Sequence, residues 1–144
     1  MKRIYLAGPY TDNESITRRL RFLSLTAEAS NLMNQGHVVF SPITHGYPIE
    51  KHCNIPGDWE FWRKQCFSFI ENWAEEVHVL MFPGWDKSVG VKAEIELAEK
   101  LGLTVKFIEY CNQNIVADDK TVDNIMADIN DGSYTEKRKA DGTY

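Results

Sequence analysis

A short segment, GWDKSVGVKAE at residues 84–94, brings glycines, a hydroxyl, a tryptophan and a carboxylate close together. Beyond it, apolar residues recur at helical spacing and predict a core-facing stripe made of Val91, Ile95, Ala98 and Leu101. Glu94 falls within this apolar arc, whereas the neighbouring charged residues fall on the opposite side. A carboxylate on the core side of a helix is a candidate for chemistry.

We expect Glu94 in the first turn of this helix, with its side chain leaning back toward the helix N-terminus. There the helix dipole favours the ionised carboxylate. Such a group can attack, or electrostatically support, an electron-poor carbon. The competing interpretation is a glutamate that caps nearby N–H groups or pairs with an arginine.

The loop before this helix combines Gly84, Ser88 and Gly90 at a helix N-terminus. Free N–H groups at such a position bind anions, and the serine hydroxyl adds a donor. A plain helix cap formed by Ser88 is the alternative, and the two roles are compatible. Trp85 in the same loop needs a stacking partner, either a flat base or a subunit interface.

Metal chemistry is not expected, because His45, His52, Cys53 and Cys66 match no zinc-binding spacing. We predict neither a metal nor a cofactor. His45 is better interpreted as a ligand contact in a loop. The remaining tryptophans, Trp59, Trp62 and Trp73, are assigned mainly to core or interface packing.

The elements that must position these residues alternate along the chain. Strands are expected at 3–7, 37–42, 76–82 and 104–110, and helices at 15–35, 58–75 and 91–101. Residues 43–57 are expected to be a loop because of their glycines and prolines. Candidate helix caps are Thr11, Asp12, Asn13 and Ser15 for the first helix, Asp58 for the second, and Gly36 at the first helix's C-terminus. This alternation predicts an α/β protein with a parallel sheet and helices on both faces.

In such a sheet, ligands bind beyond the carboxyl ends of the strands. The predicted crevice therefore collects Gly8, Pro9 and Tyr10 after the first strand with the loops that follow the later strands. The helix at 15–35 carries two apolar stripes, Ile16-Leu20-Leu23-Ala27 and Phe22-Leu25-Ala29-Leu32. One stripe covers the sheet, and the other meets either a partner subunit or the protein's own core.

The bulk composition limits the possible functions. With 144 residues the chain is long enough for one domain with a core. A net charge of −5 argues against a general nucleic-acid-binding surface, and no apolar run is long enough for a membrane span. Three cysteines without framework spacing favour a reducing, cytoplasmic setting. Residues 111–144 form an acidic extension, expected to contain one short helix through Val122, Ile125, Met126 and Ile129 and to end in disorder.

Two motifs in order, IYLAGPY at 4–10 and GW-x-x-S-x-G-x-x-x-E at 84–94, resemble the nucleoside 2-deoxyribosyltransferase-like superfamily. The resemblance covers about residues 3–110 and is strongest to a branch of uncharacterised phage and bacterial proteins. It implies a flavodoxin-like or Rossmann-like three-layer fold with a mostly parallel sheet of four to five strands over residues 1–110. It also implies a homodimer or higher homo-oligomer with shared sites.

The resemblance further implies cleavage of the N-glycosidic bond of a 2′-deoxynucleoside or its 5′-monophosphate. Glu94 matches the family's glutamate, which attacks C1′ of the deoxyribose, and Tyr5 matches its strand tyrosine. Ser88 occupies a position where enzymes acting on free nucleosides tend to have aspartate and monophosphate N-glycosidases have serine. The expected reaction releases free base and 2-deoxyribose 5-phosphate. The alternatives are a base-exchanging deoxyribosyltransferase and a nucleotide-binding or sensing module with little turnover.

One feature departs from the superfamily, whose members usually place an aspartate upstream of the glutamate to assist the leaving base. Here the corresponding segment is RKQCFSFIENW at 63–73, where Cys66 or Ser68 takes that place. Asp58, Glu60 or Asp86 could substitute. The substrate contacts expected overall are Gly8, Pro9, Tyr10, His45, Gly84, Trp85, Asp86, Ser88 and Gly90.

Overall fold

The sheet of the computed structural model, which describes residues 1–111 and 120–140, has four parallel strands in the order β2-β1-β3-β4. The strands are β1 (Arg3–Ala7), β2 (Val38–Phe40), β3 (Glu76–Leu80) and β4 (Thr104–Ile108). Tyr5 of β1 pairs with Phe40 of β2 and with Val77 of β3. The predicted parallel α/β architecture is confirmed. In this strand order the chain reverses direction across the sheet between β1 and β3, which is where a ligand crevice opens.

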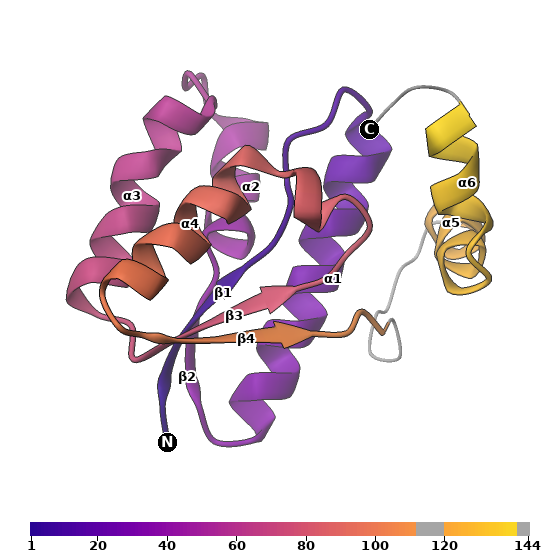
Figure 1. Ribbon diagram of the computed structural model, residues 1–144. Helices are drawn as coiled ribbons and strands as arrows, with labels where there is room; N and C mark the ends of the chain where they lie inside the picture. Colours follow the sequence, from indigo (N-terminus) through magenta and orange to yellow (C-terminus); the bar gives the residue numbers. More distant parts are fainter. Residues whose placement is uncertain (112–119, 141–144) are drawn as a thin grey trace.

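Helices cover both faces of the sheet (Figure 1). Helix α1 (Ser15–Asn34) lies on one face, and helices α3 (Trp59–Asn72) and α4 (Val89–Lys100) lie side by side on the other. Helix α2 (Pro42–His52) follows β2, and the short 3-10 helix η1 (Trp85–Lys87) precedes α4. Two further helices, α5 (Lys120–Asn130) and α6 (Ser133–Ala140), lie beside α1. Within the described residues, no helix has the length and apolar character that crossing a membrane requires.

Alternation along β1 sends successive side chains to opposite layers. Ile4 and Leu6 join the core under α1, whereas Tyr5 and Ala7 join the core under α3 and α4. All four side chains are fully buried. This alternation is what brings Tyr5 beneath α4, the helix that carries Glu94.

The start of α1 differs from the sequence prediction. Its N-cap is Glu14, which makes no capping hydrogen bond through its side chain, so none of Thr11, Asp12, Asn13 and Ser15 caps this helix. The carboxylate of Asp12 instead accepts a hydrogen bond from the Glu14 backbone N–H at 2.9 Å. The predicted C-terminal glycine is confirmed, since Gly36 has φ +90° just after the helix.

The prediction of a loop was wrong for residues 43–52, which belong to α2 (Pro42–His52), and is confirmed for residues 53–57. The Ser41 side chain accepts from the Thr44 backbone N–H at 3.4 Å, and Pro42 occupies the first turn, where its missing N–H has no cost. Gly46 fits inside the helix because it lets Trp62 approach to 3.1 Å of the place a Cβ would take. Tertiary packing therefore overrides the weak helix propensity of Gly46 and Pro48.

The C-terminal helices pack onto the core. Met126, Ile129 and Tyr134 are buried against Leu20 and Phe82, and the Tyr134 hydroxyl lies 2.8 Å from that of Thr17. The predicted helix through 122–129 is confirmed as α5, although the side chain of Val122 lies outside the described residues. Disorder was wrongly expected for 133–140, which form α6; residues 141–144 lie outside the described part.

This packing decides between the two interpretations of α1. Its stripe of Leu25, Ala29 and Leu32 covers the sheet. The other stripe contributes Ile16, Leu20 and Leu23 to the cluster formed with α5 and α6. Both stripes are therefore largely covered within the chain, although Phe22 and Ala27 are half-buried and belong to neither cluster.

Candidate active site

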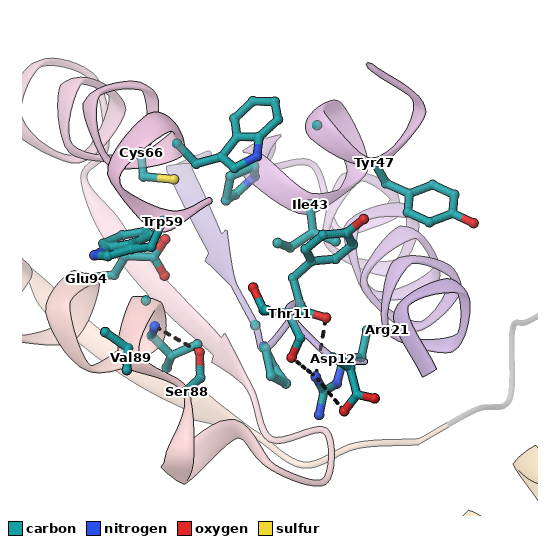
Figure 2. A pocket seen from close by; sticks show the side chains of 18 of the residues that line it. Thr11, Asp12, Arg21, Ile43, Tyr47, Trp59, Cys66, Ser88, Val89 and Glu94 are labelled. Carbon is teal, nitrogen blue, oxygen red and sulfur yellow. Dashed lines mark hydrogen bonds and ion pairs between the residues drawn. The ribbon is translucent and has the colours of Figure 1, made fainter. Parts of the chain in front are cut away.

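A cavity of about 520 Å³ opens at the carboxyl ends of the strands (Figure 2). This volume lies in the usual range for sites that hold a small molecule. Its walls come from the loop after β1, from α2, from the start of α3, and from the loop that leads into α4. The lining residues with polar or aromatic side chains are Tyr10, Thr11, Asp12, Arg21, Tyr47, Glu50, Asp58, Trp59, Trp62, Cys66, Lys87, Ser88 and Glu94.

Glu94 and Tyr5 form a buried pair at the side of the cavity nearest the sheet. The Tyr5 hydroxyl donates a hydrogen bond of 2.6 Å to Oε1 of Glu94. Glu94 lines the cavity and is 4% exposed, whereas Tyr5 lies beneath it and is fully buried. Since α4 begins at Val89, Glu94 stands at the start of the second helical turn, not in the first as predicted. The predicted stripe holds for Val91 and Ala98, but Leu101 is 46% exposed.

Burial governs the protonation of this pair. Desolvation raises the pKa of Glu94 to about 7, although hydrogen bonds from Tyr5 and Cys66 act in the opposite direction. A carboxylate with this pKa is partly protonated at neutral pH, so desolvation opposes the ionised form that the helix dipole was expected to favour. Desolvation, and then the nearby Glu94 charge, raise the pKa of Tyr5 well above 10, so its hydroxyl remains a donor.

Cys66 is one of the two residues expected, from the resemblance, in place of the superfamily's aspartate. It is buried and lines the cavity near the Glu94 carboxylate, whose charge helps to raise the pKa of the thiol. Burial raises the pKa of its thiol to about 12, so the thiol stays protonated. Ser68, the other candidate, lies on the exposed side of α3.

The suggested carboxylate substitutes are placed differently. Asp58 lines the cavity, but its carboxylate caps α3 by accepting from the Phe61 N–H at 2.8 Å. Glu60 is exposed and lies 3.9 Å from Arg63. Asp86 is also exposed and does not line the cavity.

The N-terminus of α4 opens into the cavity beside Glu94 (Figure 2). The Ser88 side chain accepts from the Val91 N–H at 3.3 Å and so caps the helix, which leaves its own O–H able to donate. Lys87, Val89 and Gly90 line the same wall. These groups can hold an anion.

Two glycines of the predicted loop have separate structural roles. Gly84 lines the cavity with φ +97°, a conformation that other residues rarely adopt. At Gly90, a Cβ would meet the Trp59 ring at 3.3 Å. Gly90 therefore allows Trp59 to pack against the first turn of α4.

Arg21 holds the opposite wall together. Its guanidinium donates to the backbone carbonyls of Thr11 at 2.8 Å, Tyr10 at 3.3 Å and Pro83 at 3.4 Å. It also lies 3.7 Å from the Asp12 carboxylate, and both side chains are buried. The buried guanidinium thus ties the loop after β1 to the loop after β3.

Of the predicted contacts, Gly8, Pro9, Tyr10, Gly84, Ser88 and Gly90 line the cavity with Glu94, whereas His45, Trp85 and Asp86 do not. His45 is exposed, with its ring 5.7 Å from that of Phe40. Trp85 packs against Phe107 within the chain, with 5.5 Å between the ring centres and the rings tilted by 52°. In the described residues, no group of three or more acidic, histidine or cysteine side chains is arranged to hold a metal ion.

Sequence reasoning missed several lining residues. Trp59 and Trp62 line the cavity in addition to packing, and so do Arg21, Tyr47 and Glu50. Trp59 directly follows the helix cap Asp58 at the carboxyl edge of the sheet, which was a usable signal. Tyr47 and Glu50 gave none, because α2 was expected to be a loop.

The fold and site define a flavodoxin-like α/β protein with a carboxylate-bearing cavity at its strand ends. Within that class, the chain belongs to the family described as domain of unknown function DUF1937, which matches residues 2–110. A similar solved structure is a 2-deoxyribosyltransferase from the psychrotolerant bacterium Bacillus psychrosaccharolyticus. The identity is 22%, the TM-score is 0.52, and the match covers 85% of this chain and 80% of the other. No curated protein matches the sequence.

Proposed function

We propose that this protein is an enzyme that cleaves the N-glycosidic bond of a 2′-deoxynucleoside 5′-monophosphate, releasing free base and 2-deoxyribose 5-phosphate. The observation that carries the proposal is the Tyr5–Glu94 pair, with its 2.6 Å hydrogen bond, at the side of a cavity large enough for a nucleotide. The likeness in fold to a 2-deoxyribosyltransferase supports the same chemistry.

In the proposed reaction the ionised Glu94 attacks C1′ of the deoxyribose. The new bond joins C1′ to Oε2, the oxygen that Tyr5 does not hold. The C1′–N bond breaks, and its electron pair leaves with the base, which takes a proton from solvent. Water then attacks C1′, releases the sugar phosphate and restores the carboxylate.

Tyr5 and Cys66 act on the attacking group in this proposal. Their hydrogen bonds favour the ionised carboxylate, while burial keeps water from solvating it. Because the Cys66 thiol stays protonated, it serves as a donor to Glu94 and not as a nucleophile. Solvent protonation of the leaving base replaces the missing aspartate.

The 5′-phosphate is assigned to the N-terminus of α4. Ser88, Val89 and Gly90 line the cavity there, and the Lys87 side chain borders the same wall. Glu94 lies six residues after Ser88, less than two turns along the same helix, so a phosphate bound at Ser88 leaves the sugar near the carboxylate. This agrees with the serine of the monophosphate N-glycosidases that the sequence resembles.

Chromatography of reactions with each deoxynucleotide and deoxynucleoside tests the proposal. Wild type should release free base, and Glu94→Ala should lower the rate by several orders of magnitude. The wild-type kcat/KM should decrease as the pH is lowered below about 7, because Glu94 then becomes protonated. Thermal unfolding of both proteins checks that the variant is folded. Near wild-type turnover by Glu94→Ala would rule out the mechanism.

A base-exchanging transferase is the second candidate, favoured by the described activity of the similar structure. Adding a second free base to the same reactions separates the two. A transferase makes a new deoxynucleotide from the acceptor, whereas the proposed hydrolase accumulates 2-deoxyribose 5-phosphate whether or not the acceptor is present.

A further inference from the structure

The wall of the cavity formed by α2 carries a carboxylate for which the proposed reaction has no role. Glu50 lines the cavity and is half-buried. Its carboxyl group packs on Gly57, where a Cβ would lie 3.2 Å from Glu50 Oε1. Gly57 has φ +70° and no side chain, so the loop approaches the carboxylate closely and restricts its position.

The Glu50 carboxylate keeps its capacity to accept hydrogen bonds. Within residues 1–111 and 120–140, the carboxylate forms no hydrogen bond or ion pair, and its charge acts on the Tyr10 phenol. Lys51, the next residue, lies 5.8 Å from the centre of the Tyr47 ring instead. An ionised carboxylate only accepts, so Glu50 suits a ligand edge that presents N–H donors.

Tyr10 supplies the complementary group next to it. Burial, and then the Glu50 charge, raise the pKa of Tyr10 to about 12, so its phenol stays protonated. The protonated phenol can donate its O–H to a ligand, and its ring meets the Tyr47 ring edge-on with 6.1 Å between the ring centres. The pair therefore offers one donor beside two acceptor oxygens.

The wall formed by α2 lies across the cavity from Ser88 and Glu94. Figure 2 shows Glu94, Trp59 and Ser88 on one side and Tyr47 on the other, with Ile43 between them. Glu50 lies one helical turn beyond Tyr47 on α2. A nucleotide with its phosphate at Ser88 and its C1′ at Glu94 therefore extends its base toward Tyr10 and Glu50.

We infer that Glu50 and Tyr10 select guanine as the base of the substrate, an inference that rests on the proposed function. The pairing edge of guanine carries the O6 acceptor followed by two adjacent donors, N1–H and N2–H. A carboxylate can accept both donors in parallel while a phenol donates to O6. Adenine and cytosine place a ring-nitrogen lone pair beside their amine, and thymine flanks its one N–H with two carbonyls, so each sets a lone pair against the carboxylate.

Hypoxanthine, which lacks the guanine amine, isolates the contribution of Glu50. We expect wild type to cleave 2′-deoxyguanosine 5′-monophosphate with a kcat/KM at least about tenfold above that for 2′-deoxyinosine 5′-monophosphate. Glu50→Gln replaces one acceptor by a donor. It should therefore abolish the preference over the inosine substrate and raise the relative rate for the adenine nucleotide. Glu99→Gln, which neutralises an exposed glutamate on α4, should leave every ratio unchanged.

Calorimetric binding of the same two nucleotides to wild type and Glu50→Gln separates this inference from the proposed function. If no deoxynucleotide is cleaved, the proposed function fails, yet tighter binding of the guanine nucleotide that Glu50→Gln removes still supports guanine recognition. If cleavage occurs with equal preference in wild type and Glu50→Gln, or another base is preferred, the guanine assignment is overturned and the proposed function stands. Absence of both cleavage and selective binding overturns both.

Discussion

The proposed reaction needs Glu94 in its ionised form, whereas the stability of the folded protein favours its protonated form. In the folded protein burial raises its pKa from 4.5 to about 7, so the folded state binds more protons than the unfolded state between these values. The contribution of Glu94 to the free energy of unfolding therefore falls by about 3 kcal/mol as the pH rises from the unfolded-state pKa to the folded-state pKa. A carboxylate kept ionised for attack thus costs stability at neutral pH and above.

Glu94→Gln should therefore become more stable than wild type as pH rises. Relative to wild type, its free energy of unfolding should increase by about 3 kcal/mol between pH 5 and pH 8, because the amide carries no buried charge. Urea unfolding at both pH values measures this difference, with Glu99→Gln as the control for an exposed glutamate. A difference that is constant with pH would show that Glu94 does not titrate in this range.

At the residue scale, the sequence indicated which carboxylate matters but not its state. Glu94 was detectable because a charged side chain interrupted an apolar stripe. The pKa of Glu94 was not predictable from the sequence, because its desolvation depends on α3 and α4 packing over Tyr5. These three parts of the chain are far apart in the sequence. Glu50 escaped detection for a related reason: only the fold brings α2 against Tyr10 and Gly57.

At the scale of elements, strands were more predictable than helix ends. Every strand matched an apolar run, and the two central strands β1 and β3 are the buried ones. Helix α2 was missed because Gly46 and Pro48 disfavour helices locally, and the packing of Trp62 against Gly46 is a long-range contact. The cap of α1 was misplaced because the loop before the helix is held by Arg21. The hydrogen bonds from Arg21 to the backbone carbonyls of this loop cannot be recognised from a local sequence pattern.

Ser88 combines a cap and a proposed phosphate contact, and two substitutions separate them. Ser88→Ala should lower the free energy of unfolding by about 1 kcal/mol, because the Val91 N–H loses its acceptor. Ser88→Asp should keep the cap, since aspartate is an equally good N-cap, but its charge should repel a phosphate and nearly abolish monophosphate binding.

Urea unfolding and calorimetry with a deoxynucleotide and its deoxynucleoside measure the two effects. Ser15→Asp adds the same charge at an exposed site outside the cavity lining and should not change monophosphate binding. If Ser88→Asp binds the monophosphate as wild type does, or if wild type prefers the free nucleoside, the phosphate lies elsewhere and the transferase interpretation gains.

At the scale of the whole molecule, the acidic extension is part of the packed structure. Met126 and Ile129 of α5 are 5% and 8% exposed and cover Leu20 and Phe82. Phe82 in turn lies 5.9 Å from the Arg21 guanidinium, which fixes a wall of the cavity. The extension therefore supports the site through the core.

Met126→Ala should lower the free energy of unfolding by about 2–3 kcal/mol, because it removes a buried side chain and leaves a cavity. Chemical denaturation followed by tryptophan fluorescence measures this loss. Asn124→Ala, on the exposed side of the same helix, is the matched control and should have little effect. Equal stability of Met126→Ala and wild type would mean that α5 does not contribute to the core in solution.

The predicted homodimer now depends on α3 and α4, since both stripes of α1 are largely covered within the chain. The two helices lie side by side, and their N-terminal ends expose Phe61 and Val89, which are 37% and 69% accessible. Val89 also lines the cavity, so a partner placed there would cover part of its rim.

Light scattering should give about twice the 16.6 kDa mass of the chain, and Phe61→Glu should restore the monomer. Phe107→Lys, on the edge strand β4, should leave the dimer intact. A wild-type monomer at micromolar concentration would refute the dimer, and dissociation by Phe107→Lys alone would move the interface to the sheet edge.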